Sequence, residues 1–177
     1  MKKIEIRISG LGGQGVVLAG QMLGRAAVYD GKNVVQTQSY GAEARGSMAK
    51  SEVIISDDKI GFPMVRRCDI LVAMNQEALD RNLKDLKEDG VLIADSTYVK
   101  KIPEIRARIF KISATEQAEK IFGDRIYANM FMLGALTKVT GAVSEKAMKK
   151  VIQDIEAKKT AKINKEAYDK GRELIEI

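Results

Sequence analysis

The sequence contains no histidine and a single cysteine, Cys68, among its 177 residues. One cysteine excludes an internal disulfide and a cysteine-bound iron–sulfur cluster, and without histidine almost any zinc site is excluded as well. Histidine is also the side chain most often used for proton transfer near neutral pH. No metal-binding residue is therefore expected in this chain.

Tryptophan is absent and aromatic residues make up only 5% of the chain, which removes most surfaces on which bases could stack. Lysine and arginine give a formal charge of +6, but they are spread along the chain among acidic residues. We therefore expect no nucleic-acid partner, while the excess of positive charge suggests an acidic ligand or partner.

Long apolar runs are also missing. No segment is long enough to span a bilayer, and the start "MKKIEIRIS" lacks the apolar core of a signal peptide. We expect a soluble, cytoplasmic protein with no membrane partner. The length suits one domain, and no linker, repeat or low-complexity segment divides residues 1–177.

Strands and helices are expected to alternate through most of the chain. The predicted strands span residues 2–9, 33–38, 51–56, 69–74, 91–96 and 107–113. The predicted helices span residues 16–29, 76–87, 113–122, 129–141 and 144–158, with a last one from residue 164. This order predicts a single three-layer α/β/α domain with a Rossmann-like, mainly parallel sheet.

The first strand alternates in polarity, with Ile4, Ile6 and Ile8 on one face and Glu5 and Arg7 on the other. A central strand of such a sheet is usually apolar on both faces. We therefore expect Glu5 and Arg7 to meet a partner or solvent.

A glycine-rich turn follows this strand in "ISGLGGQGVVLAGQML". Gly10, Gly12 and Gly15 match G-x-G-x-x-G directly after a strand and before a helix, the context in which this motif holds a phosphate. The first glycine allows a tight turn, the second lets a ligand reach the backbone, and the third permits close packing. Two interpretations stay open here, an anion site at the helix start and a tight turn that binds nothing.

The dinucleotide interpretation requires a carboxylate about 20 residues further on, at the end of the second strand. Asp30 has this spacing but precedes the strand, which ends in the uncharged residues Gln36, Thr37 and Gln38. The nicotinamide interpretation is therefore weakened.

The free energies involved indicate that the glycine turn alone would bind a phosphate only weakly. A helix terminus contributes about 0.3–2 kcal/mol to anion binding, whereas micromolar affinity needs about 8 kcal/mol. The loop from Ser39 to Lys50 is expected to supply more contacts, because Arg45 can form paired hydrogen bonds to a phosphate. In a doubly wound sheet the first two strands end side by side, so this loop should face the glycine turn. The alternative is a Glu43–Arg45 surface pair of little energetic value.

Two separated motifs carry a resemblance to a known family. One comprises Gly10, Gly12, Gly13, Gln14, Gly15 and Val16, and the other Ser39, Tyr40, Gly41, Glu43, Arg45 and Gly46. With "ISDDKIGFP", "DILVAMNQEALD" and "NMFMLGAL", they make most of the chain resemble the gamma subunit of 2-oxoacid:ferredoxin oxidoreductases. The 2-oxoglutarate branch is the most similar, and the pyruvate, branched-chain and indolepyruvate branches stay open. Ser47 departs from the glycine of many relatives.

The resemblance implies a subunit of a complex that oxidatively decarboxylates a 2-oxoacid to an acyl-coenzyme A and passes electrons to ferredoxin. It implies alpha and beta subunits as partners, with delta as a further candidate, and places thiamine diphosphate, magnesium and iron–sulfur clusters in those partners. This chain would have no catalytic residue and would be inactive alone. It would contribute to coenzyme A binding through Gly10, Gly12, Gly13, Gln14, Gly15, Ser39, Tyr40, Glu43 and Arg45.

Two other functions stay open at this point. The chain could be a free-standing oxidoreductase domain that binds NAD(P) or a flavin, against which the missing ribose carboxylate and missing histidine argue. It could also be an assembly module whose glycine turn binds nothing.

Overall fold

The computed structural model describes residues 3–42, 47–155 and 158–176, which form an α/β fold with a six-stranded sheet. The strands are β1 (Lys3–Leu11), β2 (Asn33–Tyr40), β3 (Met48–Ser56), β4 (Cys68–Ala73), β5 (Leu86–Asp95) and β6 (Arg108–Ile112). The helices are α1 (Val16–Tyr29), α2 (Gln76–Asn82), α3 (Ala114–Phe122), α4 (Ala128–Thr140), α5 (Glu145–Ile155) and α6 (Lys158–Glu173). Two short 3₁₀ turns, η1 (Leu83–Asp85) and η2 (Arg125–Tyr127), complete the elements. The predicted fold class is confirmed.

The strand order is β2-β3-β1-β4-β5-β6, and β1, β4, β5 and β6 run parallel. β3 runs antiparallel to both of its neighbours, β1 and β2. The expectation that the first two strands end side by side is therefore wrong. The connection from Tyr40 to Met48 is short, so β3 folds back along β2 and occupies the place next to β1.

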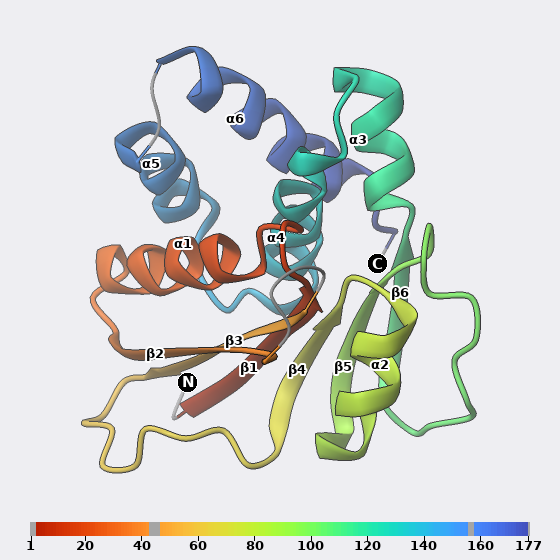
Figure 1. The fold of residues 1–177 in the computed structure, drawn as a ribbon. Helices are drawn as coiled ribbons and strands as arrows, with labels where there is room; N and C mark the ends of the chain where they lie inside the picture. Colours follow the sequence, from red (N-terminus) through yellow and green to blue (C-terminus); the bar gives the residue numbers. More distant parts are fainter. Residues whose placement is uncertain (1–2, 43–46, 156–157, 177) are drawn as a thin grey trace.

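The two faces of the sheet are covered unequally (Figure 1). α1, α4, α5 and α6 lie over one face, where Ile6 and Ile8 of β1 join the larger apolar core. The other face is covered by α2 and by long loops over a smaller core that contains Leu71, Leu79 and Leu92. None of the helices described is both long enough and apolar enough to cross a membrane.

α4 and α6 cross at two glycines. A Cβ atom on Gly171 would overlap the backbone of Phe131, and one on Gly134 would overlap the carbonyl oxygen of Tyr168. Glycine at both positions therefore allows the two helix backbones to touch, which brings the C-terminal helix onto the core.

Arg7 lies on the less covered face and is only 3% exposed, so the expectation that it meets a partner or solvent is wrong. Its guanidinium forms ion pairs with Glu52 of β3 at 2.7 Å and with Asp85 at 2.5 Å. It also donates hydrogen bonds to the Val65 carbonyl at 3.0 Å and to the Asn82 side chain at 3.3 Å. Several partners thus compensate the burial of this charge within the chain.

Glu5, the other polar residue expected to meet a partner, is half-buried beside this cluster. Its side chain pairs with Lys3 at 2.9 Å and with Lys87 at 3.4 Å, and its backbone N–H donates to Asp69 at 2.8 Å. The polar side of β1 is therefore satisfied largely by this chain's own residues.

The helix predicted over residues 76–87 is shorter than expected. α2 ends at Asn82, one 3₁₀ turn follows, and Leu86 already pairs with Cys68 of β4. Strand pairing replaces the last part of the predicted helix because it buries Leu86, which is only 6% exposed, in the smaller core. The last helix, by contrast, begins at Lys158, before the predicted residue 164.

Candidate functional site

The glycine turn joins the carboxyl end of β1 to α1. Gly13 and Gly15 adopt φ angles of +93° and +71°, which L side chains rarely adopt. Gly10 is needed for space instead, because a Cβ atom there would lie 2.7 Å from Gln14 Oε1 and 3.1 Å from Met74 Cβ. A Cβ atom on Gly15 would overlap the side chain of Asn129. The third motif glycine thus permits close packing as predicted, and the element that packs against it is α4.

Gln14 closes the turn with its side chain. Its Oε1 accepts hydrogen bonds from the backbone N–H of Leu11 at 2.7 Å and from Asn75 Nδ2 at 3.0 Å. Its Nε2 donates to the carbonyl of Met74 at 3.2 Å. Gln14 therefore ties the start of α1 to the end of β4 and fixes the shape of the turn.

The loop after β2 meets the glycine turn through one of its described residues. The backbone N–H of Gly12 donates to the carbonyl of Ser47 at 2.8 Å. A Cβ atom on Gly12 would lie 3.5 Å from that oxygen, an ordinary contact. The Gly12 N–H is thus engaged by the chain itself, and the prediction that a ligand approaches the backbone at this glycine stays a prediction.

Two of the other residues predicted to bind from that loop are described by the structure, and two are not. Ser39 and Tyr40 are exposed and belong to strand β2, where they pair with Lys50 and Ala49. Glu43 and Arg45 lie outside the described residues.

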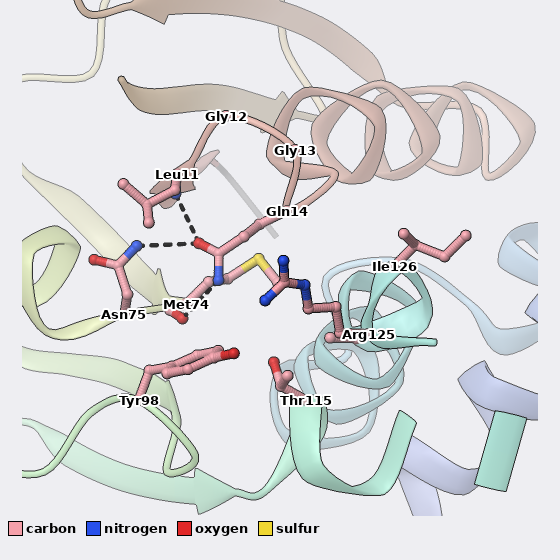
Figure 2. A pocket seen from close by; sticks show the side chains of 11 residues that line it. Leu11, Gly12, Gly13, Gln14, Met74, Asn75, Tyr98, Thr115, Arg125 and Ile126 are labelled. Carbon is pink, nitrogen blue, oxygen red and sulfur yellow. Dashed lines mark hydrogen bonds between the residues drawn. The ribbon is translucent and has the colours of Figure 1, made fainter. Parts of the chain in front are cut away.

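A cavity of about 350 Å³ lies at the carboxyl ends of β1, β4 and β5 (Figure 2). Of the predicted residues, Gly12, Gly13 and Gln14 line it. The rest of the wall is formed by Leu11, Met74, Asn75, Tyr98, Thr115, Arg125, Ile126 and Ala128. This is the edge of an open α/β sheet at which ligands bind.

Arg125 gives this cavity its charge. Figure 2 shows its side chain reaching from η2 into the space between Gln14 and Thr115, with the Tyr98 ring on the opposite wall. Within the described residues its guanidinium forms no ion pair or side-chain hydrogen bond, so its donors remain available to a phosphate or carboxylate.

The backbone adds to this positive character. α1 carries no acidic residue in its first turn, so the partial positive charge at its N-terminus is not neutralised locally. In the part of the chain that the structure describes, the Gly13 amide has no hydrogen-bond acceptor. The amide and the guanidinium thus border one cavity.

Thr115 and Asn75, two other polar residues of the cavity wall, also serve the fold. The Thr115 hydroxyl and backbone N–H bind the buried carboxylate of Asp95, at 2.6 and 3.1 Å. The Asn75 side chain accepts from the Ala78 N–H at 2.8 Å and so caps α2. These contacts fix the positions of Thr115 and Asn75 in the wall of the cavity that Arg125 also lines.

Sequence reasoning did not single out Tyr98, Thr115 or Arg125. They lie far from both glycine motifs in the chain and reach the cavity through the sheet topology. The one available signal is position, because Tyr98 follows the end of β5 and Thr115 follows the end of β6, and such segments border the ligand crevice in parallel sheets. Arg125 carries no such signal.

Asp30, the residue with the spacing of a ribose-binding carboxylate, lies at the other end of α1. It accepts hydrogen bonds from the backbone N–H and the hydroxyl of Ser144, both at 2.6 Å, ahead of α5. Its carboxylate has a structural use away from the glycine turn, which weakens the nicotinamide interpretation further.

Cys68 is fully buried. Burial raises the pKa of its thiol to about 11, although the nearby Arg7 charge opposes the shift. The thiol is therefore protonated at neutral pH and unsuited to act as a nucleophile.

Comparisons with known proteins agree with one another. The family model for pyruvate ferredoxin/flavodoxin oxidoreductase matches residues 5–174. The chain is 50% identical over 173 residues to the 2-oxoglutarate synthase subunit KorC of Methanocaldococcus jannaschii, covering 96% of this chain and 92% of the relative.

Solved structures give the same result. The keto/oxoacid ferredoxin oxidoreductase gamma subunit of Geobacter sulfurreducens superimposes with a TM-score of 0.86 at 43% identity, covering 97% of both chains. The 2-oxoglutarate:ferredoxin oxidoreductase of Magnetococcus marinus, solved with 2-oxoglutarate, coenzyme A and succinyl-CoA bound, superimposes with a TM-score of 0.90 at 27% identity. This match covers 98% of the present chain and 31% of that longer one.

Proposed function

This chain belongs to the pyruvate ferredoxin/flavodoxin oxidoreductase family as a gamma-type subunit, and from that premise we propose that it helps to hold coenzyme A in a 2-oxoglutarate:ferredoxin oxidoreductase. In this proposal the complex oxidatively decarboxylates the 2-oxoacid and releases an acyl-coenzyme A. The choice of 2-oxoglutarate rests on the 50% identity to a 2-oxoglutarate synthase subunit.

The observation that carries the proposal is the cavity beside the glycine turn. Coenzyme A bears phosphates at one end and an adenine base, and Arg125 with the Gly13 amide offers donors to an anion. Tyr98 presents an aromatic ring on the opposite wall, on which a base can stack. A volume of about 350 Å³ is at the small end of ligand cavities, so it suits part of coenzyme A, with the remainder reaching beyond this chain.

The related Magnetococcus marinus enzyme, in which this fold is one part of a longer chain, was solved with coenzyme A bound. That finding belongs to the relative, but it supports the same ligand class for the complex in which this chain would work.

The chain itself supplies binding rather than bond-making in this proposal. It has no histidine, and its one thiol is buried and protonated at neutral pH. Thiamine diphosphate with magnesium would supply the decarboxylation chemistry, and iron–sulfur clusters would carry electrons to ferredoxin. We place all of these in the alpha and beta subunits, with delta as a further candidate.

Calorimetry on the assembled complex tests the coenzyme A assignment. We expect Arg125→Gln to weaken coenzyme A binding about tenfold or more, because a charge-assisted contact to phosphate is lost. Arg106→Gln serves as the matched control, since Arg106 is an exposed arginine that pairs with Glu88 away from the cavity. Arg45→Ala and Gly12→Val test the two sequence motifs in the same titration. If coenzyme A binds every variant as tightly as the wild type, the assignment is wrong.

A further inference from the structure

The segment between β3 and β4 matches the family over "ISDDKIGFP" yet lies away from the cavity. In Figure 1 it runs along the end of the sheet where β1 begins, whereas the glycine turn lies where β1 ends. The ligand site therefore does not explain this segment.

Two contacts with the smaller core hold the loop in place. Val65 is 6% exposed and packs into the smaller core, and its carbonyl accepts a hydrogen bond from the buried Arg7. Ile60 packs against the same core from the other side of the loop tip. The residues between these two anchors are consequently presented on a fixed base.

The tip between the anchors exposes two large apolar side chains. Phe62 is 47% exposed and Met64 is 58% exposed, and Pro63 between them restricts the backbone. Both line a hollow of about 390 Å³ together with Arg66 and Arg67. We call these four residues, Phe62, Met64, Arg66 and Arg67, the FMRR patch.

The charge of this hollow is positive. Lys3 and Lys87 on its wall are already paired, with Glu5 and with Asp69 respectively. Arg67 donates a hydrogen bond to the Leu86 carbonyl, and the Arg66 guanidinium lies 5.1 Å from the centre of the Phe62 ring. Neither arginine forms an ion pair with any residue that the structure describes, which leaves two cations for an outside carboxylate.

We propose that the FMRR patch docks another polypeptide of the oxidoreductase complex, one that presents carboxylates around an apolar depression. The inference rests on the proposed function for the existence of that complex and adds the surface and the chemistry of its partner. Phe, Met and Arg are the residue types enriched at protein interfaces, where lysine is depleted. Stacking of Arg66 on Phe62 and the neighbouring proline order the patch before binding, which lowers the entropy lost on docking.

Charge argues against two other occupants. In a twofold dimer through this patch, the patch would meet its own copy, so two pairs of arginines would be brought together without a carboxylate between them. An anionic membrane usually needs a cluster of four or more free basic residues, whereas this hollow offers two and also contains Glu5.

The test uses a tagged full-length chain, expressed together with the other subunits and also titrated against them by biolayer interferometry. We expect Phe62→Asp to weaken association about 30-fold or more, as for a central interface residue. Arg66→Glu combined with Arg67→Glu should weaken it and remove its dependence on salt. Val28→Asp is the control, because Val28 is a 59% exposed apolar residue on α1.

Thermal melting of each variant separates folding from docking, and Phe62→Leu should keep most of the affinity. If Phe62→Asp melts at a lower temperature than the wild type, the affinity of the variant with Arg66→Glu and Arg67→Glu becomes the test. Wild-type chain that captures no partner subunit overturns both this inference and the proposed function. If the wild-type chain binds the partner subunits, and Phe62→Asp and the arginine variant bind them as tightly as the wild type, the inference is wrong and the proposed function stands.

A photoreactive phenylalanine analogue at position 62 identifies the occupant. We expect its crosslinks to fall on an acidic segment of a partner subunit. Crosslinks to a second copy of this chain, or capture of the isolated chain by phosphatidylserine vesicles in a Phe62-dependent way, overturn the inference.

Discussion

On the face of the sheet beneath α1 and α4, β1 buries Ile6 and Ile8 against other apolar side chains. On the opposite face the same strand buries Arg7 among Glu52, Asp85 and the Val65 carbonyl. Ile6, Ile8 and Arg7 are all buried, but the burial of the two isoleucines depends on packing and that of Arg7 on matched charges. Alternation of apolar and charged residues along a strand therefore does not by itself mean that the polar face is wet.

The comparison also shows which elements each kind of burial supports. Close apolar packing fixes helices, as at the Gly134–Gly171 crossing of α4 and α6. The Arg7 cluster also fixes irregular structure, because besides Glu52 of β3 its partners come from η1 and from the loop before β4. An ion cluster can hold segments that have no regular backbone ladder.

The largest effect is expected from breaking the charged face. Arg7→Met should lower the free energy of unfolding by about 3 kcal/mol, because Glu52 and Asp85 lose the cation that compensates their partial burial. Urea denaturation of the full chain measures this. Adding Glu52→Gln and Asp85→Asn to Arg7→Met should recover part of the loss. A triple variant no more stable than the single one would contradict the electrostatic explanation.

The apolar face should respond to added volume instead. Gly171→Ala should lower the free energy of unfolding by about 2 kcal/mol, since the new methyl group would overlap the Phe131 backbone. Alanine normally stabilises a helix interior by about 1 kcal/mol relative to glycine, so the expected sign is the reverse of the usual one. Gly61→Ala is the control, because a Cβ atom there meets nothing within 4 Å. Stabilisation by Gly171→Ala, in the same urea titrations, would contradict the close crossing.

A third effect concerns pH and the face of the sheet that holds Arg7. Burial raises the pKa of Cys68 from 9.0 to about 11, so the unfolded chain loses this proton first as the pH rises. The neutral thiol therefore adds to the free energy of unfolding in full below pH 9, and this stabilisation is lost as the pH rises to about 11. The slope of the unfolding free energy against pH corresponds to the release of at most one proton.

Unfolding curves between pH 8 and about pH 11.5 test this window, and Cys68→Ala should reduce the slope. Tyr168, whose pKa burial also raises, should leave a residual slope in that variant. A thiol reagent should modify Cys68 at pH 8 only after denaturant is added. Rapid labelling of the folded chain would show that the thiol is not buried.

Much of the fold could be predicted because local pattern and tertiary structure agree. α1 spans Val16–Tyr29 as predicted, between a glycine turn and Asp30. α4 likewise follows its apolar run and ends at Gly141 in the left-handed conformation. At Leu86 the prediction was wrong: the local pattern favoured a helix, but the residue pairs with Cys68 of β4 and belongs to the first part of β5.

The place of β3 could not be predicted in the same way. Pairing of β3 with β1 depends on contacts between residues about forty-five positions apart, such as Arg7 and Glu52, and no local pattern reports them. Those same long-range pairings decide which loop meets the glycine turn.

The candidate site was predicted in part. Gly12, Gly13 and Gln14 line the cavity, because a strand–turn–helix motif can be recognised locally. Arg125 and Tyr98 come from segments that only the strand order brings together. The sequence could indicate a glycine turn at the start of a helix, but not that Arg125 would line the same cavity.

The pairing of Arg7 with Glu52 has a consequence for the distant glycine turn. Along the same ladder, Leu11 stands opposite Met48, directly beside the Ser47 carbonyl that receives the Gly12 N–H. A slip of β3 by one residue would send the Glu52 carboxylate into the apolar layer beneath α1, where it has no partner. The buried arginine thus fixes the register of β3 on β1, and the position of Ser47 beside the glycine turn at one end of the strand depends on a charge near the middle of the strand.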